Sequence, residues 1–395
     1  MGSGFRTKSW YAASLLWAAC ASEPTLVASN CDQSGGCVKQ EALRIDAVDI
    51  LLVIDDSPSI AHKTAQLKAE LPRMLTAITT GEDGTASFPP ARSVHVAVTT
   101  ADMGGAPDEP HPVCVGGGQD GVFVRPGDVG VTCDVSYPGY LAYEGGPAAL
   151  SAVESVGCVP LVFADTKAGC GFEQPLEAAL KALWPSGDDS VTFNTGSGHG
   201  GLQNAGFLRE NSLLVVIVVS DEDDCSAADP EILALTRGDY RQQAPNLRCY
   251  LNPEKLQQPQ RYVDHLKRLR PHNDNVIFAV IGGVPADLVS DERRAAYDFN
   301  DPAQADRYFA EVLAARDMQE RTENEQEAIG RLLPSCATDI DGTLHAATPP
   351  RRLVEVARGF GSQGVLGSIC TPDFGATTGH IIRALGEKLS ATGAN

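Results

Sequence analysis

Residues 48–59 read Val-Asp-Ile-Leu-Leu-Val-Ile-Asp-Asp-Ser-Pro-Ser, and this stretch decides the fold class of the chain. Its first seven residues are almost all apolar and rich in β-branched side chains, which is typical of a strand buried on both faces. Two aspartates end the strand, and from Ser59 onward apolar residues recur at helical spacing as far as about Thr79. We therefore expect a buried strand, a polar turn and a helix, with Pro72 kinking the helix or ending it early.

The same alternation of short apolar runs and amphipathic segments continues along the chain. Further strands are expected at residues 94–100, 213–219, 276–281 and 365–369. Further helices are expected at residues 173–184, 261–269, 303–315, 353–357 and 374–389. Strands that alternate with helices predict a doubly wound, mostly parallel α/β sheet with helices on both faces. We assign this domain to residues 45–390, with disulfide-stapled insertions at residues 103–170, 222–253 and 283–350.

The charge balance excludes some classes of partner. Acidic residues outnumber basic ones by 51 to 31, so the formal net charge is −20. A surface of this charge repels phosphate backbones and anionic lipid heads, and nucleic acid is therefore not an expected partner. Cations and cationic partners are favoured instead. Apolar residues make up 43% of the chain, which is ordinary for a globular protein and excludes disorder throughout.

The eleven cysteines indicate an oxidising compartment. No Cys-x-x-Cys pair occurs, so the spacing that is typical of zinc and iron–sulfur sites is absent from the sequence. Disulfides remain, and they require oxidising surroundings. Setting Cys20 aside leaves an even number of cysteines, which we expect to pair with their sequence neighbours. The expected bridges are Cys31–Cys37, Cys114–Cys133, Cys158–Cys170, Cys225–Cys249 and Cys336–Cys370.

Residues 1–20 have the layout of a secretory signal. A short basic region is followed by a nearly uncharged apolar run at residues 10–19 and then by small residues. Residues 16–20, Leu-Trp-Ala-Ala-Cys, resemble a bacterial lipobox, which predicts that Cys20 is lipidated. Cleavage after Ala21 by ordinary signal peptidase is the alternative.

These features predict that the protein is exported. Residues 21–44 are polar and are expected to form a tether that follows the signal. The apolar run is too short to span a bilayer, so any membrane attachment is expected through the lipid alone. We expect an outer membrane lipoprotein at the cell surface, with a periplasmic or secreted protein as the alternative.

Residues 55–59 carry the most visible chemistry of the sequence. Asp55, Ser57 and Ser59 offer a carboxylate and two hydroxyls at the carboxyl end of a buried strand, where open α/β sheets bind ligands. Such hard oxygen ligands suit Mg²⁺. Asp221 ends another buried strand and is expected at the same edge of the sheet. In the alternative interpretation a serine only caps the helix, and Asp55 is an ordinary acid at a strand end.

The strand and pentapeptide at residues 48–59, the helix after them and Asp221 resemble the von Willebrand factor A (vWA) domain. The metal-ion-dependent adhesion site of that family uses Asp-x-Ser-x-Ser, a threonine from a second loop and an aspartate from a third. The resemblance implies that Ser57 and Ser59 bind the metal directly. It also implies that Asp55 and Asp221 bind the metal directly or through water.

The second loop departs from the family pattern. Residues 168–173, Ala-Gly-Cys-Gly-Phe-Glu, hold no threonine at the expected place, although Thr166 lies just upstream. Glu173 offers a substitute oxygen ligand. The chain also resembles uncharacterised exported vWA-like lipoproteins of the myxobacterial type.

The resemblance implies a metal-dependent protein-binding or adhesion module of the cell envelope, and not an enzyme. Mg²⁺, or alternatively Mn²⁺ or Ca²⁺, would be the cofactor. One position of its coordination shell would go to an acidic side chain of a protein partner. A structural envelope protein with a degenerate metal site is one alternative.

Residues 339–344, Asp-Ile-Asp-Gly-Thr-Leu, raise a second alternative, a Mg²⁺-dependent phosphatase. In that enzyme class Asp339 would be the nucleophile and Asp341 the acid and base. The motif must end a hydrophobic strand, and residues 333–338 do not read as one. A turn is therefore expected at this place.

Residues 221–224, Asp-Glu-Asp-Asp, form an acidic run that needs its own interpretation. We expect the last three of these residues on a solvated face of a loop. A second, calcium-like site formed together with the inserted loops is the alternative.

Overall fold

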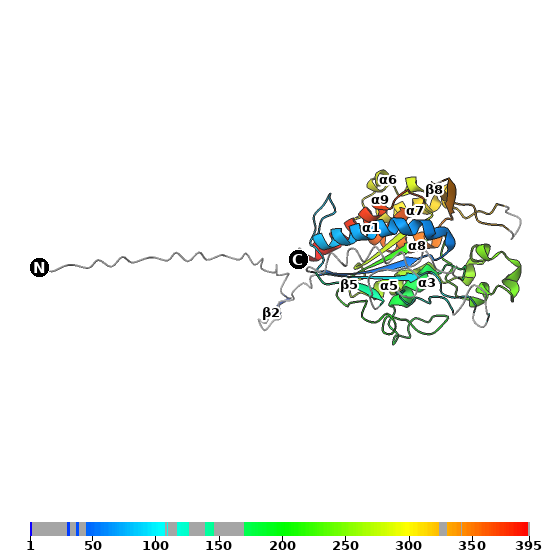
Figure 1. Cartoon of the computed structure of the whole chain (residues 1–395), viewed down its shortest axis with the longest axis horizontal. Helices are drawn as coiled ribbons and strands as arrows, with labels where there is room; N and C mark the ends of the chain where they lie inside the picture. Colours follow the sequence, from blue (N-terminus) through cyan, green and yellow to red (C-terminus); the bar gives the residue numbers. More distant parts are fainter. Residues whose placement is uncertain are drawn as a thin grey trace. The chain divides into compact units, whose positions relative to one another are not determined.

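The computed structural model describes residues 45–106, 109, 117–125, 139–145, 170–323, 330–340 and 342–393, together with residues 1, 30–31 and 37–38. The chain divides into two units, residues 1–42 with 394–395 and residues 43–393 (Figure 1). In the first unit, strands β1 (Asn30–Cys31) and β2 (Cys37–Val38) pair antiparallel, and their register sets Cys31 opposite Cys37. The expected signal, its Cys20 and most of the expected tether lie outside the described residues.

A six-stranded sheet forms the centre of the second unit, in the order β10-β7-β6-β3-β4-β5. Five of its strands are parallel, namely β3 (Ala47–Ile54), β4 (Ser93–Thr100), β6 (Leu213–Val219), β7 (Val276–Gly282) and β10 (Gly364–Ser368). The edge strand β5 (Tyr140–Tyr143) runs antiparallel to β4. The first long strand, β3, lies inside the sheet with later strands on both sides of it, so the expected mostly parallel, doubly wound α/β sheet is confirmed.

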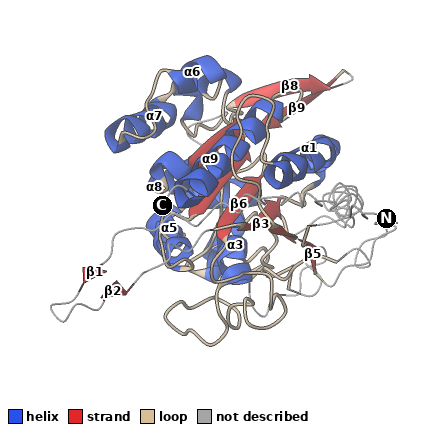
Figure 2. Ribbon diagram, turned by 90° about the vertical axis from the view of Figure 1, so that its left-hand side faces the viewer, coloured by secondary structure: helices blue, strands red, loops and turns tan. Residues whose placement is uncertain are grey.

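Helices cover both faces of this sheet (Figures 1 and 2). One face packs against α1 (Ala61–Thr80) and α9 (Gly375–Gly393). The other face packs against α3 (Pro175–Leu183), α5 (Pro259–Arg268), α7 (Pro302–Ala314) and α8 (Arg351–Gly359). Two shorter helices, α4 (Arg248–Leu251) and α6 (Asp291–Ala295), belong to the connections.

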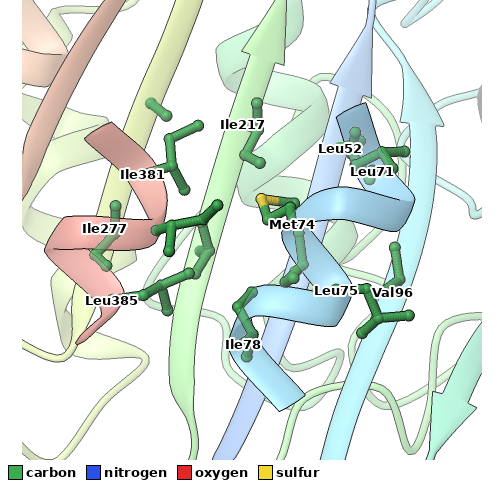
Figure 3. Close-up of a cluster of buried hydrophobic side chains, with 14 of the residues drawn as sticks. Leu52, Leu71, Met74, Leu75, Ile78, Val96, Ile217, Ile277, Ile381 and Leu385 are labelled. Carbon is green, nitrogen blue, oxygen red and sulfur yellow. The ribbon is translucent and has the colours of Figure 1, made fainter. Parts of the chain in front are cut away.

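Strand β3 is buried on both faces because its alternate side chains enter two different cores. Ile50 and Leu52 belong to the core under α1 and α9, and Figure 3 shows Leu52 beside Leu71 of α1. Leu51 and Val53 belong to the core under α3 and α5. The sheet is therefore held from both sides, which fixes the position of its carboxyl edge.

Helix α1 does not end at Pro72, contrary to one of the two sequence expectations. It continues to Thr80 and ends at Gly81, whose φ of 76° places it in the left-handed region that favours glycine. The backbone N–H of Gly81 donates to the carbonyl of Ala77, which satisfies one of the last carbonyls of the helix.

Two of the expected disulfides are present, Cys225–Cys249 and Cys336–Cys370, with Cα–Cα distances of 5.5 Å and 6.1 Å. Cys170 is also disulfide-bonded, and its expected partner Cys158 lies outside the described residues. Cys114 and Cys133, which were expected to pair with each other, also lie outside the described residues. Within the described part of the chain, no helix is long and apolar enough to cross a bilayer.

A β-hairpin stands apart from the main sheet. Strands β8 (Cys336–Ile340) and β9 (Thr343–Ala347) pair antiparallel and form a small sheet of their own. Figure 2 shows this hairpin beyond the main sheet. The Cys336–Cys370 bridge connects it to the segment between β10 and α9.

Candidate functional site

Asp55 stands at the carboxyl end of β3, and its carboxylate is held by the backbone and by a neighbouring loop. The side chain is fully buried. Its Oδ1 accepts a hydrogen bond from the backbone N–H of Ser57 at 2.8 Å, and its Oδ2 accepts one from the hydroxyl of Ser220 at 2.7 Å. Its backbone N–H donates to the carbonyl of Val219 at the end of β6. The ends of β3 and β6 are therefore joined around this carboxylate.

The two serines of the pentapeptide connect Asp55 to the acid that follows β6. The hydroxyls of Ser57 and Ser59 lie 2.8 Å apart, and the hydroxyl of Ser59 donates to Oδ1 of Asp221 at 3.2 Å. Asp221 is buried, whereas Ser57 is half-buried and Ser59 is exposed. The structure thus brings together the four residues that the sequence singled out, with one side open to solvent.

Glu173 joins the same cluster from the segment before α3. It is 3% exposed, and no described residue forms a hydrogen bond to its Oε2. Oxygen atoms of Asp55, Asp56 and Glu173 all lie within 4.8 Å of one another. Glu173 therefore lies close enough to Asp55 and Asp56 to take the place of the threonine that the second loop lacks.

Three further carboxylates of the cluster were missed by the sequence reasoning, those of Asp56, Asp102 and Glu222. The charges of Asp102 and Asp55 act on Asp56, and the charge of Asp55 acts on Glu222. Asp102 lies two residues beyond the end of β4 and pairs through its backbone with Glu173. Acids just beyond β3, β4 and β6 were the available sequence signal, since parallel strands end at one edge of the sheet.

Burial and mutual repulsion make the ionised state of this cluster costly. Burial, together with the charge of Asp55, raises the pKa of Asp221 to about 8 and that of Glu222 to about 7. Burial also raises the pKa of Asp56 to about 7. For Glu173, burial and the charges of Asp55 and Asp56 raise the pKa well above its ordinary value.

The cluster consists of six acids: Asp55, Asp56, Asp102, Glu173, Asp221 and Glu222. No arginine, lysine or histidine of the described chain forms an ion pair with any of them. The buried ion pairs found there use other acids, such as Asp49, Glu177 and Asp224. The cluster offers hard oxygen donors that no cation of the described chain compensates. They are Oε2 of Glu173 and Oδ1 of Asp56, which are buried without a hydrogen bond, and the hydroxyls of Ser57 and Ser59. This donor set fits Mg²⁺, Mn²⁺ or Ca²⁺, all of which bind carboxylate and hydroxyl oxygens.

The last two acids of the run at residues 221–224 have a different role from the one expected. The expectation of a solvated loop face was wrong for both. Asp223 accepts hydrogen bonds from the backbone N–H groups of Arg352 and Leu353 in the first turn of α8. Asp224 accepts from the backbone N–H of Leu176 in α3 and from the guanidinium of Arg352. These carboxylates stabilise two helix N-termini.

The phosphatase alternative finds no support at Asp339. This residue is exposed on β8, in the hairpin that stands apart from the main sheet, and its Oδ1 accepts from the backbone N–H of Gly342. The motif requires the end of a buried strand, which Asp339 does not occupy. Asp341 lies outside the described residues.

Comparisons with protein-family models and with curated protein sequences found no match. Among solved structures, the chain is similar to the human COPII-coat protein Sec24c, with a TM-score of 0.29 and 12% sequence identity. The matched region covers 64% of this chain and 28% of that protein.

Proposed function

We propose that this protein is a vWA-type binding module that holds a divalent cation at the carboxyl edge of its sheet. The observation that carries the proposal is the buried, unpaired Glu173 carboxylate beside Asp55 and Asp56. An unpaired buried carboxylate costs several kcal/mol of folding free energy unless a cation or a proton compensates it. A bound divalent cation would offset the mutual repulsion of the cluster.

The arrangement of the donors supports a binding site and not only a structural one. Ser57 and Ser59 face the more open side of the cluster, whereas Asp55 and Glu173 lie on its buried side. When bound, the cation would supply an electrophilic centre that can take an oxygen ligand from outside. An acidic side chain of a protein partner is the ligand we propose for that open position.

The proposed setting is the cell envelope. The signal-like residues 1–20 favour export, and the Cys225–Cys249 and Cys336–Cys370 bridges support an oxidising compartment. Lipidation at Cys20 would attach the protein to a membrane.

Calorimetric titration with Mg²⁺, Mn²⁺ and Ca²⁺ tests the metal. The wild type should bind at least one of these ions. The double variant Ser57→Ala with Asp221→Ala should lose this binding while it keeps its far-ultraviolet circular dichroism. Asp339→Ala is the matched control, because it removes an exposed carboxylate outside the cluster. Equal heats from the wild type and the double variant would show that the cluster holds no metal.

Peptides test the proposed ligand. Immobilised peptides that carry one glutamate should retain the protein in Mg²⁺ and release it when a chelator is added. Peptides with glutamine in the same position should not retain it. Retention that is independent of both the metal and the carboxylate would contradict an adhesive role for this site.

A further inference from the structure

A cavity of about 410 Å³ opens directly beside the carboxylate cluster. Glu173 and Glu222 belong to both the cluster and the cavity wall. Much of the remaining wall comes from residues 223–256, which include the Cys225–Cys249 bridge, from residues 320–334, from β9 and from the N-terminus of α8. Regions expected as insertions therefore build a groove around the proposed metal site.

The wall of this groove combines apolar and acidic side chains. Phe172, Tyr250 and Leu256 provide the apolar part, and Glu173 and Glu222 provide acids. A third glutamate, Glu320, also lines the groove, and its Oε2 lies 3.9 Å from Nε of Arg351, so its charge is partly compensated. A long side chain with an aliphatic stem and a cationic head matches such a wall, because its methylenes pack on apolar surface while its charge stays near carboxylates.

The arginines of the wall do not compensate the acids that the groove shares with the cluster. Arg352 contacts Asp224 at 3.0 Å, and Arg331 contacts Glu323 at 2.8 Å. Neither forms an ion pair with Glu173 or with Glu222. One divalent cation offsets only two negative charges, so a further positive charge next to this cluster of six acids is favourable.

The rim of the groove carries an exposed apolar side chain. Leu344 on β9 is 70% exposed and lines the groove. The Cys336–Cys370 bridge holds its hairpin to the segment after β10. Leu344 therefore adds apolar surface to the rim of the groove.

We propose that the groove receives a lysine or arginine side chain of the protein partner, next to the acidic side chain that binds the metal. This inference rests on the proposed function, since it places the basic residue beside the metal-bound carboxylate. The partner motif is then an acid with a basic residue close to it in space. Glu222 and Glu320 recognise the positive charge beside Glu173, which the proposed cation occupies, and the apolar wall packs on the stem.

Short synthetic peptides with a central glutamate test this inference. Lysine, norleucine or glutamate is scanned over the neighbouring positions, and binding is measured by fluorescence anisotropy with Mg²⁺ or with chelator. The best lysine peptide should bind about tenfold more tightly than its norleucine analogue. Glu320→Gln should reduce this preference and leave the Mg²⁺ heat unchanged. Glu387→Gln, an exposed acid on α9, is the matched control.

The outcomes separate this inference from the proposed function. Mg²⁺ binding with equal affinity for lysine and norleucine peptides would overturn the groove assignment and retain the metal site. A lysine preference that Glu320→Gln reduces, without any Mg²⁺ heat, would retain the groove and overturn the metal site. Absence of both, or two metal ions per chain with no lysine preference, would overturn the inference.

Discussion

The two ends of β3 carry buried aspartates in opposite electrostatic surroundings. Asp49, near the amino end, is fully buried and contacts Arg209 at 2.6 Å and Arg270 at 3.4 Å. Asp55, just beyond the carboxyl end, is equally buried and is surrounded by other acids. The charge of Asp49 is thus neutralised by arginines at one edge of the sheet, whereas the charge of Asp55 has no basic partner among the described residues at the other edge.

This difference separates the parts of the molecule that stabilise the fold from the part that is free to bind. A buried charge with a well-placed partner costs little to keep and much to disturb. A buried charge without a partner lowers stability until a ligand arrives, and that deficit favours binding. The amino edge therefore stabilises the fold, and the carboxyl edge carries the proposed binding site.

The largest expected effect is a loss of stability when the ion pairs of Asp49 are removed. Asp49→Asn leaves the buried guanidinium of Arg270 without its carboxylate and should cost about 3–5 kcal/mol of unfolding free energy. Asp55→Asn should cost far less in metal-free protein, because it also removes repulsion. Urea unfolding measures both variants. If Asp49→Asn does not accumulate as folded protein, Arg209→Met gives a milder test, and equal losses at the two ends would refute the comparison.

The unfolding free energy should depend on pH because the acids at the carboxyl edge of the sheet have no basic partners in the described part of the chain. The pKa values are raised to about 8 for Asp221 and to about 7 for Asp56 and Glu222. Groups with raised pKa values contribute stability that is fully present below their unfolded values and is lost as pH rises through the folded ones. In chelator, the unfolding free energy should therefore fall by several kcal/mol as the pH rises from about 4 to about 8.

Saturating Mg²⁺ provides the control for that pH series, because a bound cation keeps the carboxylates ionised without the cost of repulsion. Urea unfolding with Mg²⁺ should show most of the lost stability restored at the alkaline end. Parallel pH profiles with Mg²⁺ and with chelator would indicate that the metal does not bind at these acids.

Glu173, just before α3, and Glu177, in its first turn, allow a sharper test in which the expected effects are smaller. Glu177 is 4% exposed and bonds to Arg261 at 3.1 Å and to the hydroxyl of Tyr262 at 2.9 Å. Glu177→Gln should cost about 1.5–3 kcal/mol of stability and leave Mg²⁺ binding unchanged. Glu173→Gln should leave stability equal or higher and weaken Mg²⁺ about tenfold. Calorimetry and urea unfolding decide this, and a stability loss at Glu173 like that at Glu177 would contradict its assignment.

The smallest expected effects concern two serines at opposite ends of the sheet. The hydroxyl of Ser212 is buried beside Asp49 and donates to it, so Ser212→Ala should cost about 1 kcal/mol of unfolding free energy without changing metal affinity. Ser57→Ala should change stability by less than about 0.5 kcal/mol and weaken Mg²⁺ severalfold. The same two measurements apply, and a reversed pattern would show that Ser57 serves the fold alone.

Much of the fold was predictable because the signals were local. The apolar run at residues 48–54 and the run at residues 213–219 each specify a buried strand by themselves. Their carboxyl ends must meet in a parallel sheet, so the amino-acid sequence alone was enough to place Asp55 and Asp221 together. Two disulfides followed from the order of the cysteines.

The missed features depend on partners that are remote in the sequence. Asp223 and Asp224 bond to Arg352, which follows them by more than a hundred residues, so their run looked like a solvated loop. Asp49 interrupts an apolar strand, and its partners Arg209 and Arg270 lie far along the chain, so nothing in the sequence indicated these ion pairs. Asp102 follows a strand in a glycine-rich segment, and only the backbone bridge to Glu173 shows where it belongs.

The loop at residues 221–224 has a consequence for the entropy of binding. Asp224 is bonded to α3 and to Arg352, Asp223 is bonded to the first turn of α8, and the backbone carbonyl of Asp221 accepts from Thr348. A loop fastened at so many points has little conformational freedom left to lose. An incoming cation would therefore find this side of its coordination shell already assembled, and the entropic penalty would fall mainly on the partner's own chain.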